Sequence, residues 1–369
     1  MPAAPGVIAS VSRGRSWAGA GAGLALAVLI CLLAPAGANG QVPAGFFGVV
    51  PQGPLAPRDF ERMRGLDLTI RMPIYWFEVE PEPGRYDFSV PDRIVAEAAV
   101  RGIGVLPFVY GSPPWVATDQ ARPPLDSAAA RRAWSAFLSR LVGRYGPAGD
   151  FWDGREAKRP IRRWQIWNEP NFAIFWRPGP SPRGYARLLK ISARAVRRLD
   201  PKAEIAAAAV APVAGDLRPW EFLRRLYRVP GVESAFDVAA LHPYAVSVRG
   251  VEYAVRQTRQ VLAQAGDGRL PLLVTELGVA SASQVPNPFD RGPRGQARFL
   301  RRAFARLSTH RERWRLDGVY WFAWQDLPRP DPSCVFCQFA GLVDFQGTPK
   351  PSWWSFRRSL LRAEAGPVR

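Results

Sequence analysis

The chain reads Trp164-Gln165-Ile166-Trp167-Asn168-Glu169-Pro170-Asn171 at a point where an apolar, aromatic run ends in an amide, a carboxylate and a proline. Residues 270–278, Leu-Pro-Leu-Leu-Val-Thr-Glu-Leu-Gly, repeat this pattern and place Glu276 near their end. Near-continuous apolar runs are typical of parallel strands that are buried on both faces. In α/β barrels the chemistry lies at the carboxyl ends of such strands. The two stretches therefore predict two buried strands, each with a glutamate at its tip.

Runs of this kind alternate along the chain with segments whose apolar side chains recur at helical spacing. One predicted helix is well delimited, because Ser127 can cap its start and Gly146 can end it. The unbroken alternation predicts an α/β fold of the (β/α)8 or TIM barrel type. A doubly wound sheet is the alternative, but no glycine-rich phosphate loop follows the first strand. The predicted strands are residues 45–50, 66–73, 104–110, 164–169, 204–210, 236–244, 270–276 and 317–326.

A short Gly/Pro linker follows residue 38, and beyond it no linker or change of composition divides the chain. Residues 39–369 are therefore predicted to form a single barrel domain, which is within the size range of one TIM barrel. Residues 74–88 are rich in proline and glycine, so we expect a long loop at the active rim of the barrel rather than regular structure.

Residues 1–38 have the pattern of a secretory signal peptide. Arg13 and Arg15 precede an apolar run at residues 17–33, and Ala36-Gly37-Ala38 offers a cleavage site between small residues. An uncleaved membrane anchor is the alternative, because the apolar run is long. No later stretch is apolar enough to span a bilayer, so we expect a secreted or extracytoplasmic protein that is either free or anchored by this segment.

The net charge of +19 raises nucleic acid as a partner, but the basic residues are dispersed and form no basic arm or block. Nearly all of them are arginine, in company with abundant Ala, Pro and Gly, a bias that can reflect nucleotide composition rather than a binding face. We therefore expect no nucleic-acid partner, and attraction to an acidic glycan or cell envelope is the alternative that ranks above nucleic acid. The 14 tryptophans suit stacking on sugars, although many are expected to be core side chains.

The cysteines bear on redox state and on metal binding. Cys31 lies inside the predicted signal, which leaves Cys334 and Cys337 in the exported part. This pair is consistent with a tight disulfide, a reduced redox pair or half of a metal site. A zinc site is disfavoured, because there is no second cysteine pair and the chain has only two histidines. We favour a local disulfide and expect no metal and no organic cofactor.

Two strand-tip glutamates could cleave a glycosidic bond, which needs one carboxylic acid and one carboxylate. The motifs Trp167-Asn168-Glu169-Pro170-Asn171 and Thr275-Glu276-Leu277-Gly278 resemble those of clan A, the retaining glycoside hydrolases with glutamates on strands four and seven. Residues 237–244, which end in His-Pro-Tyr, resemble the sixth strand of that clan. The residues after the Asn-Glu-Pro motif are most similar to family 39, the β-xylosidases and α-L-iduronidases, with family 5 a near second.

The resemblance implies that Glu169 is the general acid/base and that Glu276 is the nucleophile. It also implies that Asn168 hydrogen-bonds the 2-hydroxyl of the sugar and that Arg71 lies beside Glu276. The adjacent guanidinium would favour the charged form of that carboxylate. Neighbouring strand tips and rim loops supply further predicted substrate-binding residues: His242, Tyr244, Trp324, Trp76 and Trp115.

The roles of these further residues differ. His242 and Tyr244 match the tip of the sixth strand and are expected to orient the nucleophile or the substrate, although a structural role for the histidine is the alternative. Trp324 is expected to form the apolar platform beneath the sugar. Alternation places Tyr320, Phe322 and Trp324 on one side of the last strand, so one of these aromatic residues should face the barrel. Trp76 and Trp115 are expected to stack on sugars from rim loops, with plain packing as the alternative.

The sequence thus predicts an exported glycoside hydrolase that cleaves β-linked polysaccharides or oligosaccharides with retention and needs no obligate protein partner. Two departures from family 39 put its sugar specificity in doubt: residues 321–326 match the eighth-strand pattern only loosely, and no segment resembles an appended β-sandwich. A non-catalytic glycan-binding barrel at the cell envelope is the alternative. The retention of Glu169 and Glu276 alongside Asn168 and Arg71 argues against that alternative.

Overall fold

The computed structural model describes residues 41–212, 217–331, 334 and 336–365. Residues 39–369 form one compact unit. The predicted secretory segment, residues 1–38, lies outside the described residues. Within the described part of the chain, no helix combines the length and apolar character that are needed to cross a membrane.

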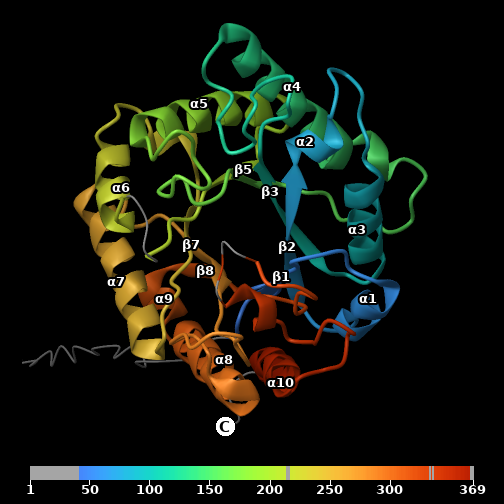
Figure 1. Ribbon diagram of the computed structural model, residues 1–369. Coiled ribbons are helices and arrows are strands. Elements are labelled where there is room, and N and C mark those ends of the chain that lie inside the picture. Colours follow the sequence, from blue (N-terminus) through green and yellow to red (C-terminus); the bar gives the residue numbers. More distant parts are fainter. Residues whose placement is uncertain (1–40, 213–216, 332–333, 335, 366–369) are drawn as a thin grey trace, which may run out of the picture. The chain divides into compact units, whose positions relative to one another are not determined.

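Eight parallel strands form a barrel whose sheet order is β5-β4-β3-β2-β1-β8-β7-β6 (Figure 1). The two edges of this sheet meet through parallel bridges between Ala206 and Val238 and between Val210 and Leu241. The predicted (β/α)8 fold is therefore confirmed. The strands are β1 Phe47–Val50, β2 Leu68–Tyr75, β3 Gly104–Tyr110, β4 Arg163–Ile166, β5 Glu204–Ala207, β6 Ala239–Leu241, β7 Leu272–Leu277 and β8 Leu316–Phe322.

Helices surround the barrel (Figure 1). The helix predicted from Ser127 to Gly146 is α4, and the Ser127 hydroxyl accepts a hydrogen bond from the backbone N–H of Ala130 at 3.0 Å, as expected of a capping serine. The α-helices are α1 Pro57–Met63, α2 Trp76–Val79, α3 Ser89–Val100, α4 Ala128–Tyr145, α5 Pro182–Leu199, α6 Pro219–Tyr227, α7 Val248–Gln264, α8 Gly292–Thr309, α9 Arg311–Trp314 and α10 Pro351–Ala365. Short 3-10 helices span Asp150–Trp152, Glu233–Ala235 and Cys337–Phe339.

The apolar core has two layers. A larger cluster packs the outer face of the sheet against the helices, and a smaller one fills the barrel. Inside the barrel, Gly48 leaves room for Tyr320, because a Cβ atom at Gly48 would lie 2.3 Å from that ring. Such dense filling makes the barrel a packed core with its functional groups at the end. The inner cluster consists of Val50, Leu106, Ala206, Ala209, Val238, Ala240, Leu273 and Tyr320.

The expectation of a long rim loop at residues 74–88 is wrong in part. Strand β2 continues to Tyr75, and α2 follows at once. Trp76, the first residue of α2, is buried, and its indole N–H donates to a Glu80 carboxylate oxygen at 2.7 Å. The other Glu80 oxygen accepts from the backbone N–H of Gly84 at 2.9 Å. The prolines and glycine mark only a tight turn, while the aromatic residues before them are held by the core.

Candidate active site

Four charged or polar side chains from distant parts of the chain meet at the carboxyl end of the barrel. Arg71 lies in β2 and Glu276 in β7, while Glu169 follows β4 and His242 follows β6 directly. Arg71 and His242 are 0% exposed, and Glu169 and Glu276 are 7% and 9% exposed. Because charged groups are almost never this buried unless they are paired, their partners determine what the cluster can do.

Arg71 connects the side chains of this cluster through hydrogen bonds. Its guanidinium donates through Nε to Gln165 Oε1 at 2.7 Å, through Nη1 to Glu276 Oε1 at 2.5 Å and through Nη2 to Asn168 Oδ1 at 3.0 Å. The guanidinium also lies 4.0 Å from the centre of the Phe108 ring. The structure thus brings Arg71, Asn168 and Glu276 together, and it fixes a positive charge against the Glu276 carboxylate.

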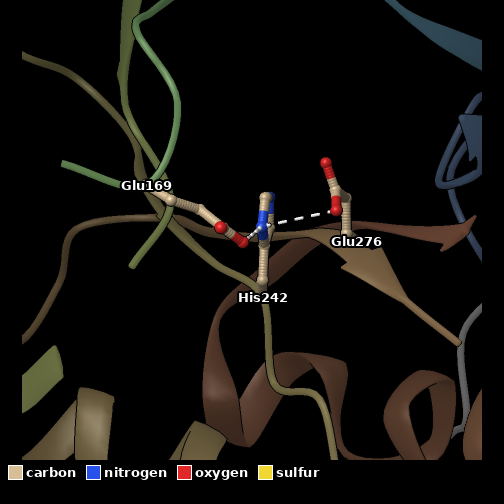
Figure 2. Close-up of side chains that lie close together, drawn as sticks. All are labelled: Glu169, His242 and Glu276. Carbon is tan, nitrogen blue, oxygen red and sulfur yellow. Dashed lines mark hydrogen bonds and ion pairs between the residues drawn. The ribbon is translucent and has the colours of Figure 1, made fainter. Parts of the chain in front are cut away.

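His242 lies between the two glutamates (Figure 2). Its Nδ1 is 2.5 Å from Glu169 Oε1 and 3.5 Å from Glu276 Oε2. Burial, and then the nearby Arg71, lower the pKa of His242 well below 6.5, so the ring is neutral at ordinary pH. Nε2 is buried without a hydrogen-bond partner among the described residues. A lone pair on Nε2 is the less costly arrangement, which places the proton on Nδ1, facing Glu169.

The two carboxyl groups have different environments. Glu276 accepts from Arg71 and also from the Tyr244 hydroxyl, at 2.6 Å, whereas Glu169 has His242 as its side-chain partner among the described residues. Burial raises the pKa of Glu169 well above 4.5, and repulsion from Glu276 raises it further, against an opposing effect of Arg71. Two carboxyls with environments this unequal are suited to separate acid and base roles.

Tyr244 joins the site from the loop after β6. Burial, and then the negative charge of Glu276, raise the pKa of its hydroxyl well above 10, so it remains a hydrogen-bond donor to Glu276. Its ring packs edge-on against Phe322 and Phe336, at 6.2 Å and 5.1 Å between centroids. These contacts fix the hydroxyl against the carboxylate.

The backbone that carries Glu169 is locally strained. Trp167 and Glu169 have φ angles of 74° and 36°, in the left-handed region that non-glycine residues rarely adopt. Such residues cost on the order of 1–3 kcal/mol each and persist where surrounding contacts hold them. Asn171 is one such contact, since its buried amide donates to the carbonyls of Ala211 and Leu217, both at 3.1 Å. The last residue of the motif thus has a structural role.

The structure does not bring the predicted tryptophan platforms to the carboxylates as expected. Trp324 is 0% exposed and packs edge-on against Trp353 of α10 at 5.4 Å. Trp76 is also 0% exposed and packs against Trp134 and Phe137. Neither indole offers a free face, so we leave both out of the proposed sugar site.

Trp115 is half-buried. Its Nε1 donates to the Glu80 carbonyl at 3.1 Å, and its ring packs edge-on against Trp76 at 5.5 Å. Of the three predicted tryptophans, Trp115 is therefore the one whose side chain is still partly accessible to solvent.

Two residues at the site, Gln165 and Phe336, were not predicted from the sequence, and a third, Phe322, was one of three aromatic candidates on the last strand. Gln165 orients Arg71 and donates to the Ala207 carbonyl at 3.1 Å, and its signal was a polar residue in the middle of an apolar strand. Phe322 ends β8 and its ring lies beside Tyr244, whereas Trp324 was the residue expected to form the platform beneath the sugar. Phe336 had no signal, because it enters from the cysteine loop. That loop is closed by a disulfide between Cys334 and Cys337.

Glu169, His242 and Glu276 could also ligate a metal ion, because one ligand atom from each lies within 4.8 Å of the others. The guanidinium of Arg71 is already 2.5 Å from Glu276 and balances its charge. Most of the ligand atoms also have hydrogen-bond partners from the chain itself. The arrangement therefore fits separate acid and base roles for the two carboxyl groups better than metal binding.

Comparison with known proteins identifies the fold that carries this cluster. No family model matches the chain. A curated β-xylosidase from Geobacillus stearothermophilus is 28% identical over 138 residues, which is 34% of this chain and 25% of that protein. A family 39 glycoside hydrolase from Bacteroides cellulosilyticus WH2 matches with a TM-score of 0.63 and 20% identity, over 86% of this chain and 63% of that one.

A family 5 enzyme from Streptomyces cattleya, of the GH5_18 group, matches with a TM-score of 0.64 and 17% identity, over 89% of this chain and 82% of that one. The fold is thus that of the family 39 and family 5 glycoside hydrolases, and the resemblance noted in the sequence is confirmed. The chain spans less than two thirds of the family 39 structure and the match covers a quarter of the curated β-xylosidase.

Proposed function

We propose that this protein is a glycoside hydrolase that cleaves β-linked glycans with retention of configuration. The observation that carries this proposal is the pair of buried carboxyls, Glu169 and Glu276, which have oxygens within 4.8 Å of each other and unequal environments. Retaining enzymes hold their carboxyls about 5–5.5 Å apart, whereas inverting enzymes hold them about 6.5–9.5 Å apart to admit a water molecule.

In the proposed first step, a Glu276 oxygen attacks the anomeric carbon while the bond from that carbon to the leaving oxygen breaks. Glu169 gives its proton to the leaving oxygen, and a glycosyl ester on Glu276 results. In the second step, Glu169 takes a proton from water as the water attacks the same carbon. The ester bond breaks, the sugar leaves with retained configuration, and both carboxyl groups return to their first states.

The surrounding residues would support these steps in distinct ways. The neutral His242 donates to Glu169 through Nδ1 and so orients the acid without adding a charge that would lower its pKa. Arg71 and the Tyr244 hydroxyl donate hydrogen bonds to the Glu276 carboxylate and so hold this nucleophile in a fixed orientation. Asn168, held by Arg71, is placed to hydrogen-bond a hydroxyl of the sugar beside the reacting carbon.

The first substrates to test are β-xylosides, because the curated relative is named a β-xylosidase. We further propose that the protein is exported, on the basis of the basic, apolar and small-residue pattern of residues 1–38. An exported enzyme of this kind would act on polysaccharides or oligosaccharides outside the cytoplasm.

The test is to incubate the protein with activated 2-fluoro-glycosides of xylose, glucose, mannose and galactose, then to measure intact mass and map the labelled peptide. We expect a stable adduct on Glu276 with one of these sugars. An adduct on another residue would assign the nucleophile elsewhere. If folded protein forms no adduct and turns over none of the matching aryl glycosides, the non-catalytic glycan-binding alternative is favoured.

A further inference from the structure

A basic groove lies on the outside of the barrel, between α4 and α5. Figure 1 shows these two helices side by side, and the buried indole N–H of Trp134 in α4 donates to Ser192 Oγ of α5 at 2.9 Å. The groove has a volume of about 850 Å³. Among the described residues, seven cationic side chains line it and no carboxylate does: Arg131, Arg132, Arg183, Arg187, Lys190, Arg194 and Arg198.

Five of these cations form a continuous row along α5. They are residues 183, 187, 190, 194 and 198, so their spacing of three or four residues places them on one face of the helix. With a rise of about 1.5 Å per residue, the row is about 22 Å long. One edge of the groove therefore presents a positive charge at nearly every helical turn.

The charges in this row are not neutralised by the described part of the chain. Arg183, Arg187 and Arg194 are exposed, and no described carboxylate forms an ion pair with any of them. Arg197 lies on the same helix but outside the groove, and its guanidinium pairs with Asp237 at 2.8 Å. Like charges at this spacing repel one another, so their gathering points to an anionic partner outside the chain.

We propose that this groove binds a strand of acidic polysaccharide. Guanidinium groups bind carboxylate and phosphate oxygens through paired hydrogen bonds, and a polyanion with a charge on each sugar can match a row of cations. The proposal rests on the proposed function only in the choice of a glycan over another polyanion. It adds a second, non-catalytic contact that would hold the exported enzyme on a charged polymer.

The lining of the groove distinguishes this occupant from other polyanions. No Trp, Tyr or Phe of the described part of the chain lines it, whereas single-stranded nucleic acids are bound by stacking of bases on such side chains. A membrane surface is broad, so it would contact the edges of the groove without reaching floor residues such as the buried Ala195. A charged glycan strand is narrow and flexible enough to reach the floor of the groove, and it needs no aromatic side chains for stacking.

The experiment measures binding of the full chain to polygalacturonate by calorimetry, with fully methyl-esterified polygalacturonate as the uncharged counterpart. We expect binding to the acid form alone, and we expect the affinity to fall at least about tenfold between 50 mM and 500 mM salt, because salt screens exposed charges. The double variant Arg187→Glu, Arg194→Glu should lose at least about tenfold in affinity and keep its turnover of small aryl glycosides.

The matched control is Arg301→Glu, Arg302→Glu, which makes the same change of net charge on exposed residues of α8, outside the groove. It should lose less than about threefold in affinity. Equal losses in both double variants, or no binding to polygalacturonate, would overturn the proposal. Tighter binding to a DNA oligonucleotide or to vesicles with anionic lipid than to polygalacturonate would overturn the choice of a glycan. The affinities do not depend on turnover, so Glu276→Ala should bind polygalacturonate as the wild type does even if the proposed catalytic function fails.

Discussion

The active site and the α4–α5 groove use arginine in opposite ways. Arg71 is 0% exposed, donates to three side chains and lies at the centre of a cluster drawn from β2, β4 and β7. Arg187 and Arg194 are exposed on one helix and have no described carboxylate partner. In the active site, the charge of Arg71 is balanced by groups of the protein itself. In the α4–α5 groove, the arginine charges are left for an external partner.

This difference teaches what each region is suited to do. Buried and satisfied charges have fixed positions and act strongly on one another, because the protein interior screens them less than water does. Exposed charges in a row are flexible and screened by salt, so they attract a partner without defining its chemistry. Catalysis belongs to the first kind of region and reversible attachment to the second.

The largest effect that separates the two regions is expected from the glutamates. Glu276→Ala should lower kcat on an aryl glycoside by about 10⁴-fold or more, because no nucleophile remains. Glu169→Ala should retain much of the activity on substrates with activated leaving groups, which need no protonation. Steady-state kinetics with leaving groups of graded acidity provide the measurement. Normal activity of either variant on an unactivated glycan would remove the residue from its proposed role.

A second large effect concerns the two kinds of arginine. Arg71→Met should lower the free energy of unfolding by about 3–5 kcal/mol, because Glu276 then keeps a buried charge without its partner. Arg194→Met is the control, and as an exposed change it should stay within about 0.5 kcal/mol of the wild type. Urea unfolding of both variants measures the difference. Similar losses in the two variants would contradict the contrast drawn between the two regions.

A smaller effect concerns the pH dependence of stability. The pKa of Glu169 is raised in the folded state by burial and by Glu276, so the folded protein holds this proton to a higher pH than the unfolded chain does. The stability that this proton contributes is complete below about 4.5 and is lost as the pH rises through the raised value. Glu169→Gln has no such proton to lose.

The stability of Glu169→Gln relative to wild type should therefore increase as the pH rises above 4.5, then level off above the raised pKa. Thermal unfolding across a pH series would measure the change. The exposed Glu233 provides the control variant Glu233→Gln, whose relative stability should remain flat. If the stability of Glu169→Gln relative to wild type does not change with pH, the pKa of Glu169 is not raised in the folded protein.

The smallest effect is expected from salt on the catalytic step. Turnover of a small neutral aryl glycoside should change less than about twofold between 50 mM and 500 mM salt, because the charges of the site are buried and paired. Binding of an acidic polymer should fall steeply over the same range. Parallel dependence of both quantities on salt would mean that the groove and the site are not electrostatically separate.

The sequence predicted the fold and most of the residues around the carboxylates, for a definite reason. Buried parallel strands leave uninterrupted apolar runs, and helices leave apolar residues at helical spacing, so the eight-fold alternation could be read directly. Glu169 and Glu276 were identified because each ends such a run. The same kind of pattern was present but not recognised in the basic row of α5, where dispersed arginines fall on one helical face.

The sequence could not predict which aromatic residues face the site. Alternation placed Phe322 and Trp324 on the same side, but β8 ends at Phe322. Beyond it, the backbone N–H of Trp324 donates to the Val50 carbonyl at 2.8 Å, and the indole packs on Trp353. A period of two holds only while a strand continues, so the end of β8 decided which ring lies beside Tyr244.

By itself, then, the sequence determined the alternation of elements, the strand-tip glutamates and the row of cations, because these depend on local periodicity. The tertiary structure alone decided that His242 lies between the two carboxyls, that Arg71 joins Gln165, Asn168 and Glu276, and that the basic row faces α4. The physical reason is that distances between strand ends depend on how the barrel closes, and the proton affinity of Glu169 depends on burial and neighbours that exist only after closure.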